Sequence, residues 1–115
     1  MRVTARAHPN VALVKYWGKR DSALNLPATG SLSVTLSGLF TETTVEAHAG
    51  GDEVVIADPQ GGAARSEEIE RARRFLDRVR ALAKDERGLR VSSRSNFPRA
   101  AGLASSASGF AALAV

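Results

Sequence analysis

Two short segments of this sequence carry residues whose types and spacing suit the binding of phosphate groups. The first is KYWGK at 15–19, which places two lysines, a tyrosine and the only tryptophan of the chain on neighbouring positions. Lysine ammonium groups are point donors for phosphate, and a tyrosine hydroxyl adds a neutral donor. A ligand with several anionic oxygens is the kind of ligand that such a run can hold.

The geometry of a strand limits how this first segment can work. Regular alternation would send Lys15, Trp17 and Lys19 to one face and Tyr16 to the other, unless Gly18 bends the chain. Such a bend would bring Tyr16 and Lys19 to the same ligand. The alternative is an edge strand with exposed lysines and a buried tryptophan, and composition alone favours that alternative.

The second segment, PRAAGLASSASG at 98–109, sets glycines and serines between a predicted strand and a predicted helix. Glycines let a backbone approach a bulky anion, the helix start offers free N–H groups, and serine hydroxyls reach phosphate oxygens or magnesium. The segment matches neither G-x-x-x-x-G-K-[ST] nor G-x-G-x-x-G. The alternative is that its small residues merely let a helix pack tightly against a sheet.

Other kinds of chemistry find little support. The chain has no cysteine, so a disulfide framework, a thiolate metal site and a cysteine nucleophile are excluded. His8 and His48 have no third residue at metal-ligand spacing, which argues against a histidine metal site. A serine hydrolase is disfavoured because G-x-S-x-G is absent.

The elements that must position these segments follow from the hydrophobic pattern. Alternation predicts a hairpin in which two antiparallel strands pair through the turn Gly50-Gly51-Asp52. Apolar residues at helical spacing predict a helix with Ser66 as its N-cap and Gly88 as its stop. A second helix is predicted from near Ser105, and the chain ends inside it, which indicates a fragment. The predicted strands are 2–7, 11–17, 31–38, 43–49, 53–58 and 89–95.

Composition indicates a soluble globular domain, with 43% hydrophobic and 24% charged residues. The net charge of +4 suits anionic ligands, although the basic residues between Arg65 and Arg90 alternate with acidic ones. No apolar run approaches the ~20 residues that span a bilayer, and the N-terminus has no apolar stretch typical of a secretory signal. We therefore expect a cytoplasmic protein without a membrane partner.

Both phosphate-binding segments lie in longer stretches that resemble one family. Residues 10–36 and 96–113 are similar to the N-terminal part of diphosphomevalonate decarboxylases, members of the superfamily of galactokinase, homoserine kinase, mevalonate kinase and phosphomevalonate kinase (GHMP). The resemblance implies an α+β fold of the ribosomal protein S5 domain 2 type. Residues 1–115 would form an incomplete ATP- and substrate-binding domain, and a ferredoxin-like C-terminal domain would be absent from this chain.

The resemblance also implies an activity. Family members use ATP and Mg²⁺ to phosphorylate (R)-5-diphosphomevalonate, which then loses phosphate and carbon dioxide and becomes isopentenyl diphosphate. The resemblance thus implies that ATP and diphosphomevalonate are the ligands and that nucleic acid is not a partner. A homodimer is possible for the full-length protein, because dimers are common in the family. Phosphoryl transfer depends mainly on positioning and electrostatics, which suits a site rich in phosphate-binding groups.

Site residues carry over position by position. By resemblance, Lys15 lies near the reacting centre, and Ser106 reaches the transferred phosphate or Mg²⁺. Asn96 would lie near the base or ribose, and Arg71 aligns loosely with an arginine that contacts the substrate. The substrate diphosphate would be held by Tyr16, Trp17, Gly18 and Lys19, and the ATP phosphates by Gly102, Leu103, Ala104, Ser105 and Ser106.

Two departures from the family pattern matter. Arg99 stands where the family pattern has threonine, which adds a positive charge beside the phosphate loop. The catalytic aspartate of the family, its second serine-rich loop and the following arginine would all lie beyond residue 115. We therefore expect the 115-residue chain alone to be inactive, and turnover of diphosphomevalonate by the purified chain would contradict this expectation.

Two alternative functions stay open at this point. A GHMP-type kinase, such as a mevalonate or phosphomevalonate kinase, would stop after phosphorylation, and release of carbon dioxide separates it from a decarboxylase. A non-catalytic basic module that binds nucleic acid would fit the pI of 10.3. The mixed-sign charge and the aromatic content of 5% argue against that module.

Overall fold

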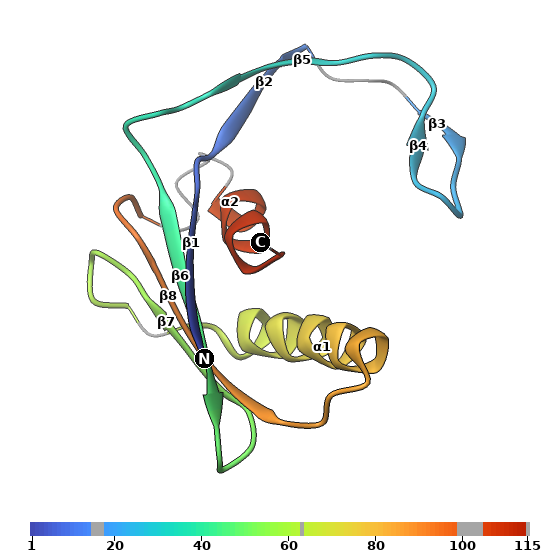
Figure 1. Ribbon diagram of the computed structural model, residues 1–115. Helices are drawn as coiled ribbons and strands as arrows, with labels where there is room; N and C mark the ends of the chain where they lie inside the picture. Colours follow the sequence, from blue (N-terminus) through green and yellow to red (C-terminus); the bar gives the residue numbers. More distant parts are fainter. Residues whose placement is uncertain (15–17, 63, 99–104, 115) are drawn as a thin grey trace.

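The centre of the molecule is a four-stranded sheet covered on one face by two helices (Figure 1). The computed structural model describes residues 1–14, 18–62, 64–98 and 105–114. The strand order is β1–β6–β8–β7, and only the β7–β8 pair is parallel. The fold is therefore α+β, as predicted. The elements of this unit are β1 (Arg2–Ala7), β6 (Thr41–His48), β7 (Glu53–Ala57), α1 (Ser66–Ala83), β8 (Gly88–Ser95) and α2 (Ser105–Ala114).

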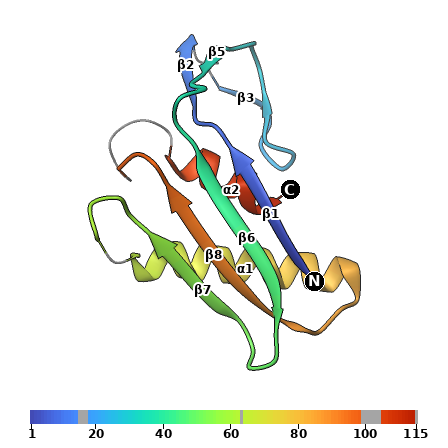
Figure 2. The same cartoon turned by 60° about the vertical axis from the view of Figure 1, so that its left-hand side comes forward.

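The predicted hairpin between β6 and β7 is wrong, because β8 lies between these two strands (Figure 2). Gly88 of β8 pairs with His48 of β6, and Arg90 of β8 pairs with Glu53 of β7. The connection over 49–52 therefore reaches across an intervening strand instead of closing a tight turn. Both strands were predicted at nearly their observed positions, but their neighbour in the sheet comes from beyond α1.

Helix α1 is capped one residue before the predicted N-cap, and it ends at Ala83, well before the predicted stop at Gly88. Its N-cap is Arg65 rather than Ser66, and the carboxylate of Glu68 accepts a hydrogen bond from the Arg65 amide at 3.1 Å. The helix stops before Gly88, because Lys84 takes a left-handed conformation (φ 53°) and its N–H bonds to the Arg80 carbonyl. Gly88 instead begins β8.

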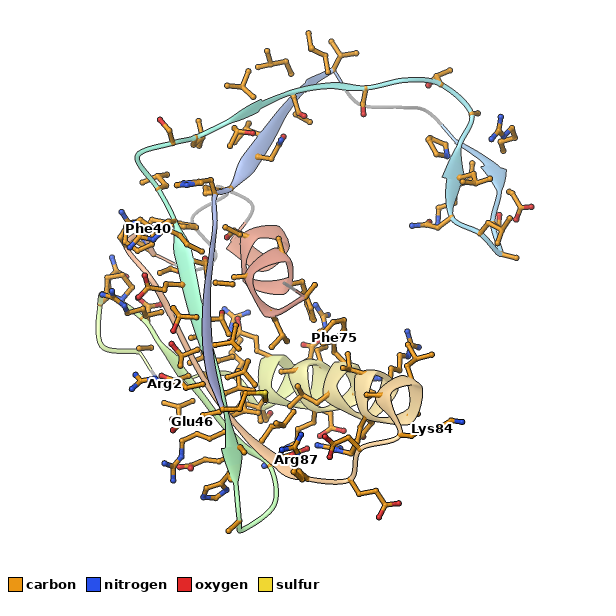
Figure 3. The ribbon with its side chains drawn as sticks, viewed as in Figure 1. Arg2, Phe40, Glu46, Phe75, Lys84 and Arg87 are labelled. Carbon is orange, nitrogen blue, oxygen red and sulfur yellow. The ribbon has the colours of Figure 1, made fainter. Side chains whose placement is uncertain are left out.

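The core lies between the inner face of the sheet and the two helices, and it is small. Phe75 of α1, which is labelled in Figure 3, and Phe110 of α2 meet edge to face with ring centroids 6.3 Å apart, so the two helices also contact each other. None of the helices in the described ranges is both long and apolar enough to cross a bilayer. Among the residues that the structure describes, the buried hydrophobic side chains include Ala72, Leu76, Val91, Phe97 and Ala112.

The outer face of the sheet carries paired charges. Glu42 accepts hydrogen bonds from Arg6 at 2.9 Å and from Arg94 at 2.8 Å, and these bonds, that from Arg6 first, hold the pKa of Glu42 below its usual range. Arg2 and Glu46, which are register partners, lie on this face as well (Figure 3). Charges of both signs therefore compensate one another on this face.

Two small ribbons extend beyond the main sheet (Figure 1). β2 (Asn10–Val14) pairs with β5 (Leu32–Thr35), and residues 8–9 separate β2 from β1. The strand predicted over 31–38 is thus shorter than expected, and its Leu32 and Val34 are exposed. β3 (Lys19–Asp21) pairs with β4 (Leu26–Pro27) at the far end of the ribbon.

Candidate functional site

The start of α2 is a suitable place for a phosphate group. Helix α2 begins at Ser105, inside the predicted glycine-serine segment, and its first turn carries no acidic side chain. Free N–H groups and the helix dipole favour an anion at such an end. The first turn of α1, in contrast, carries Glu67 and Glu68, so its end already has negative charge.

Part of the predicted ATP-binding set lies outside the described residues. This applies to Gly102, Leu103 and Ala104 and to the side chains of Ser105 and Ser106. Arg99, the departure from the family pattern, lies outside as well. At the start of α2 the structure thus describes the backbone of Ser105 and Ser106 but not their side chains.

The first of the two segments predicted to bind phosphate, residues 15–19, is described at its C-terminal end. Lys15, Tyr16 and Trp17 lie outside the described residues. Gly18 has a positive φ of 70°, a conformation that favours glycine, and its carbonyl accepts a bond from the Ala28 amide at 3.3 Å. Lys19 follows as the first residue of β3. Gly18 itself belongs to neither β2 nor β3.

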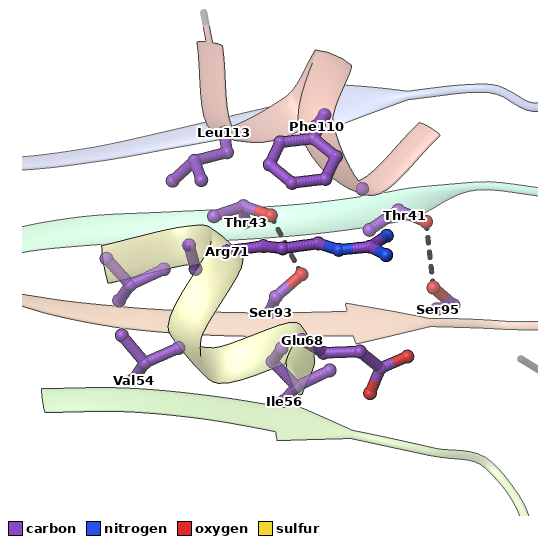
Figure 4. Close-up of a pocket in the computed structure, with 13 residues that line it drawn as sticks. Thr41, Thr43, Val54, Ile56, Glu68, Arg71, Ser93, Ser95, Phe110 and Leu113 are labelled. Carbon is purple, nitrogen blue, oxygen red and sulfur yellow. Dashed lines mark hydrogen bonds between the residues drawn. The ribbon is translucent and has the colours of Figure 1, made fainter. Parts of the chain in front are cut away.

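A cavity of about 140 Å³ lies between the inner face of the sheet and the helices (Figure 4). Hydroxyl side chains of β6 and β8 line one part of it, and apolar side chains such as Ile56, Phe110 and Leu113 line another. Arg71 extends along this cavity from α1 toward Thr41, and its guanidinium bonds to Glu67 at 2.6 Å. Arg71 therefore lines the same cavity as side chains of the sheet.

The structure does not gather all the predicted substrate-binding residues in one place. Lys19 belongs to the β3–β4 hairpin, which stands apart from α1 and its Arg71 (Figure 1). The separation arises because the β2–β5 ribbon carries this hairpin away from the main sheet. Among the described residues, no group of three or more His, Asp or Glu side chains is placed to hold a metal ion.

The sequence patterns did not reveal a set of hydrogen-bonded hydroxyl groups, some buried and some half-buried. Thr41 bonds to Ser95 at 2.7 Å, and two residues further along β6, Thr43 bonds to Ser93 at 2.9 Å (Figure 4). Thr41 also bonds to Ser108 of α2 at 2.9 Å. The signal that could have found them is the alternation of threonine and serine in two strands, because residues two apart share a face.

Asn96 follows β8 directly and is bonded to another segment of the chain. Its side-chain oxygen accepts a bond from the Phe40 amide at 2.7 Å, and its side-chain nitrogen donates to the Gly38 carbonyl at 3.0 Å. The backbone of Asn96 donates to the Phe40 carbonyl at 3.1 Å. The side chain thus joins the end of β8 to the segment before β6.

Replacing Asn96 with aspartate tests this joining role. Asp retains an oxygen for the Phe40 amide but turns the donor toward Gly38 into a second oxygen, so we expect the free energy of unfolding to fall by about 1 kcal/mol. Urea unfolding measures this loss. Unchanged stability together with weaker ATP binding would instead mean that the side chain serves the nucleotide.

The mixed sheet, with a helix that starts in a glycine-serine segment, is the arrangement of a GHMP-superfamily N-terminal domain. Residues 7–115 match the family model described as "Diphosphomevalonate decarboxylase-like N-terminal domain". The chain belongs to this family. The match covers both segments that were predicted to bind phosphate, 15–19 and 98–109.

Individual relatives agree with this assignment. Diphosphomevalonate decarboxylase of Debaryomyces hansenii is 42% identical over 97% of this chain, and phosphomevalonate decarboxylase of Haloferax volcanii is 42% identical over 100% of it. These matches cover 32% and 35% of the two relatives, so the chain spans about a third of their length.

Solved structures agree as well. The mevalonate diphosphate decarboxylase of Enterococcus faecalis, studied for its mevalonate diphosphate mediated ATP binding, has a TM-score of 0.77 and 43% identity, with 99% of this chain and 35% of that chain covered. A second structure with the same score, identity and coverage is MDDEF in complex with MVAPP, AMPPCP and magnesium. Because the identity is 43%, these structural matches support the family assignment and not only the likeness of the fold.

Proposed function

We propose that the complete gene product carrying this chain decarboxylates (R)-5-diphosphomevalonate in an ATP-dependent reaction that yields isopentenyl diphosphate, ADP, phosphate and carbon dioxide. The observation that carries this proposal is the start of α2 at Ser105, within the glycine-serine segment of a chain that belongs to the decarboxylase family. The relatives that bind MVAPP, an ATP analogue and magnesium support it. Residues 1–115 would be the ATP- and substrate-binding part.

The residues of this chain would divide the work between two anionic ligands. The N–H groups at the start of α2 and the preceding loop would bind the ATP phosphates, with Ser106 also placed to reach a magnesium ion. Magnesium, when bound, neutralises phosphate charge. Gly18, with its positive φ, would let the chain fold around the substrate diphosphate. The groups proposed to hold that diphosphate are Tyr16, Trp17 and Lys19, and Arg71 would contact the same substrate.

The chemistry of the reaction explains why so many cationic and N–H donors are needed. ATP, a diphosphate and a carboxylate must meet in one site, and their mutual repulsion has to be offset before the phosphoryl group can move. Lys15 is proposed to lie near the reacting hydroxyl, where its charge would stabilise the negative charge that develops. Orientation of both ligands supplies the remainder of the rate enhancement.

The decisive experiment counts two products. The complete gene product is incubated with ATP, magnesium and diphosphomevalonate labelled at its carboxyl carbon, and we expect equal amounts of carbon dioxide and ADP. ADP without carbon dioxide would mean a kinase of the same superfamily, and neither product would overturn the proposal. The purified 115-residue chain, run in parallel, is expected to give neither.

A second substrate is favoured by one observation. The Haloferax volcanii relative, which is 42% identical over all of this chain, is a phosphomevalonate decarboxylase. The same assay should therefore be run with labelled phosphomevalonate. If kcat/KM is higher for the monophosphate than for the diphosphate, phosphomevalonate becomes the proposed substrate, and the proposed ATP-dependent decarboxylation is unchanged.

A further inference from the structure

Three hydroxyl groups from three different elements meet in the core beside the start of α2. Thr41 of β6 is hydrogen-bonded both to Ser95 of β8 and to Ser108 of α2, at 2.7 Å and 2.9 Å. Thr41 is 2% exposed and Ser108 is 1% exposed, so the bond between these two residues is shielded from water. A shielded hydrogen bond is stronger and more directional than one that competes with solvent.

The second threonine of the same strand provides a comparison within the molecule. Thr43 is also 2% exposed and also bonds across to β8, through Ser93 at 2.9 Å. Among the described residues, Thr43 has no hydrogen bond to α2, whereas Thr41 bonds to Ser108, the fourth residue of that helix. The two threonines therefore differ in one respect, the bond from the sheet to the helix.

Apolar contacts between α2 and its surroundings do not replace this bond. Phe110 packs edge to face on Phe75 of α1, and such contacts are non-directional, so they tolerate small rotations of a helix. A hydrogen bond at 2.9 Å restricts the rotation and the shift of the helix start more tightly. Residues 105–108 form this first turn, which contains Ser106.

We propose that the Thr41 hydroxyl is a positioning residue for ATP binding, because through Ser108 it fixes the first turn of α2 against the sheet. The inference rests on the proposed function, in which this turn and the loop before it bind the ATP phosphates. The small residues of α2 let the helix lie close to the sheet, and Thr41 then sets where along the sheet its N–H groups lie. Thr41 itself touches neither ATP nor substrate.

The test compares three substitutions in the complete gene product. Thr41→Val removes the hydroxyl and retains the shape, Thr41→Ser retains the hydroxyl, and Thr43→Val is the matched control. We expect Thr41→Val to raise the KM for ATP, and the Kd for a non-hydrolysable ATP analogue with magnesium, by about tenfold. The KM for diphosphomevalonate should change less than about twofold, and both other variants should keep the wild-type affinity for ATP.

Each outcome separates the inference from the proposed function. If the wild-type protein turns over substrate and Thr41→Val binds ATP as Thr43→Val does, the positioning role is wrong and the decarboxylase stands. If Thr41→Val selectively weakens ATP binding while the protein releases no carbon dioxide, the positioning role stands and the decarboxylase is wrong. If the wild-type protein binds no ATP, both are overturned.

A second variant guards against a folding defect in Thr41→Val. Ser108→Ala removes the same bond from the helix side and adds no bulk. We expect it to raise the Kd for the ATP analogue about as much as Thr41→Val, by about tenfold. A normal Kd for Ser108→Ala would contradict the inference, even if Thr41→Val did not fold.

Discussion

Replacing Gly88 with alanine is expected to lower the free energy of unfolding by about 3 kcal/mol, because the added methyl group has no space. A Cβ at this position would lie 2.7 Å from the carbonyl oxygen of His48 and 2.8 Å from backbone atoms of Gly51. Both neighbours are main chain, so they cannot rotate away as a side chain could. Urea unfolding of the variant measures the loss.

The Gly88 prediction has a matched control in the same chain. An added Cβ on Gly30 would meet no heavy atom within 4 Å, and Gly30 has no positive φ, so Gly30→Ala should unfold at nearly the wild-type urea concentration. Equal stability of Gly88→Ala and the wild type would mean that β8 does not enter the sheet between His48 and Gly51. That result would contradict the strand order described above.

Replacing Asp52 with asparagine is expected to cost about 2 kcal/mol, because charged hydrogen bonds at a half-buried site are lost. Both Asp52 oxygens lie 2.6 Å from one nitrogen of Arg80, and one of them also accepts the Leu89 amide at 3.0 Å. These bonds join the loop after β6 to α1 and β8. Thermal or urea unfolding measures the change.

Asp77 provides the control for this pair. It bonds to the same arginine at 2.7 Å, but its side chain is 68% exposed, whereas that of Asp52 is 17% exposed. Solvent weakens exposed pairs, so Asp77→Asn should unfold at nearly the wild-type urea concentration. If Asp52→Asn and Asp77→Asn lowered the free energy of unfolding equally, burial could not explain the strength of the Asp52–Arg80 pair.

The same pair predicts how stability depends on pH. Burial by itself would raise the pKa of Asp52, but the bonds from Arg80 and the Leu89 amide outweigh it and the pKa is lowered from 3.8. The stabilisation is therefore fully present above the unfolded value and is lost as the pH falls below it. The difference in unfolding midpoint between wild type and Asp52→Asn should shrink below about pH 4. A difference that grew with acidity would contradict this assignment.

Local patterns predicted where most elements lie but not how they associate. The strands 43–49 and 53–58 were found because alternation and composition are local properties, and they are observed as β6 and β7. Their pairing was wrong, because insertion of β8 depends on contacts between residues far apart in the sequence. The end of α1 was misplaced because Lys84 adopts a left-handed conformation that the sequence pattern does not mark.

The candidate site was predictable to a similar degree. The start of α2 at Ser105 followed from small residues after a proline and glycines, all of which are local signals. The bond of Thr41 to Ser108 was not predictable, because it joins β6 to a helix 67 positions later. Asn96 was expected near the nucleotide, and its bonds to Gly38 and Phe40 give the same side chain a role within the fold.

The late position of β8 in the sequence has a consequence for synthesis on the ribosome. β6 and β7 emerge first, and the edges that they turn toward each other have no partner until α1 and β8 have followed. Unpaired strand edges are templates for pairing with other chains. The nascent protein therefore passes through an interval in which its two inner edges need protection, and that interval ends when Gly88 enters between His48 and Gly51.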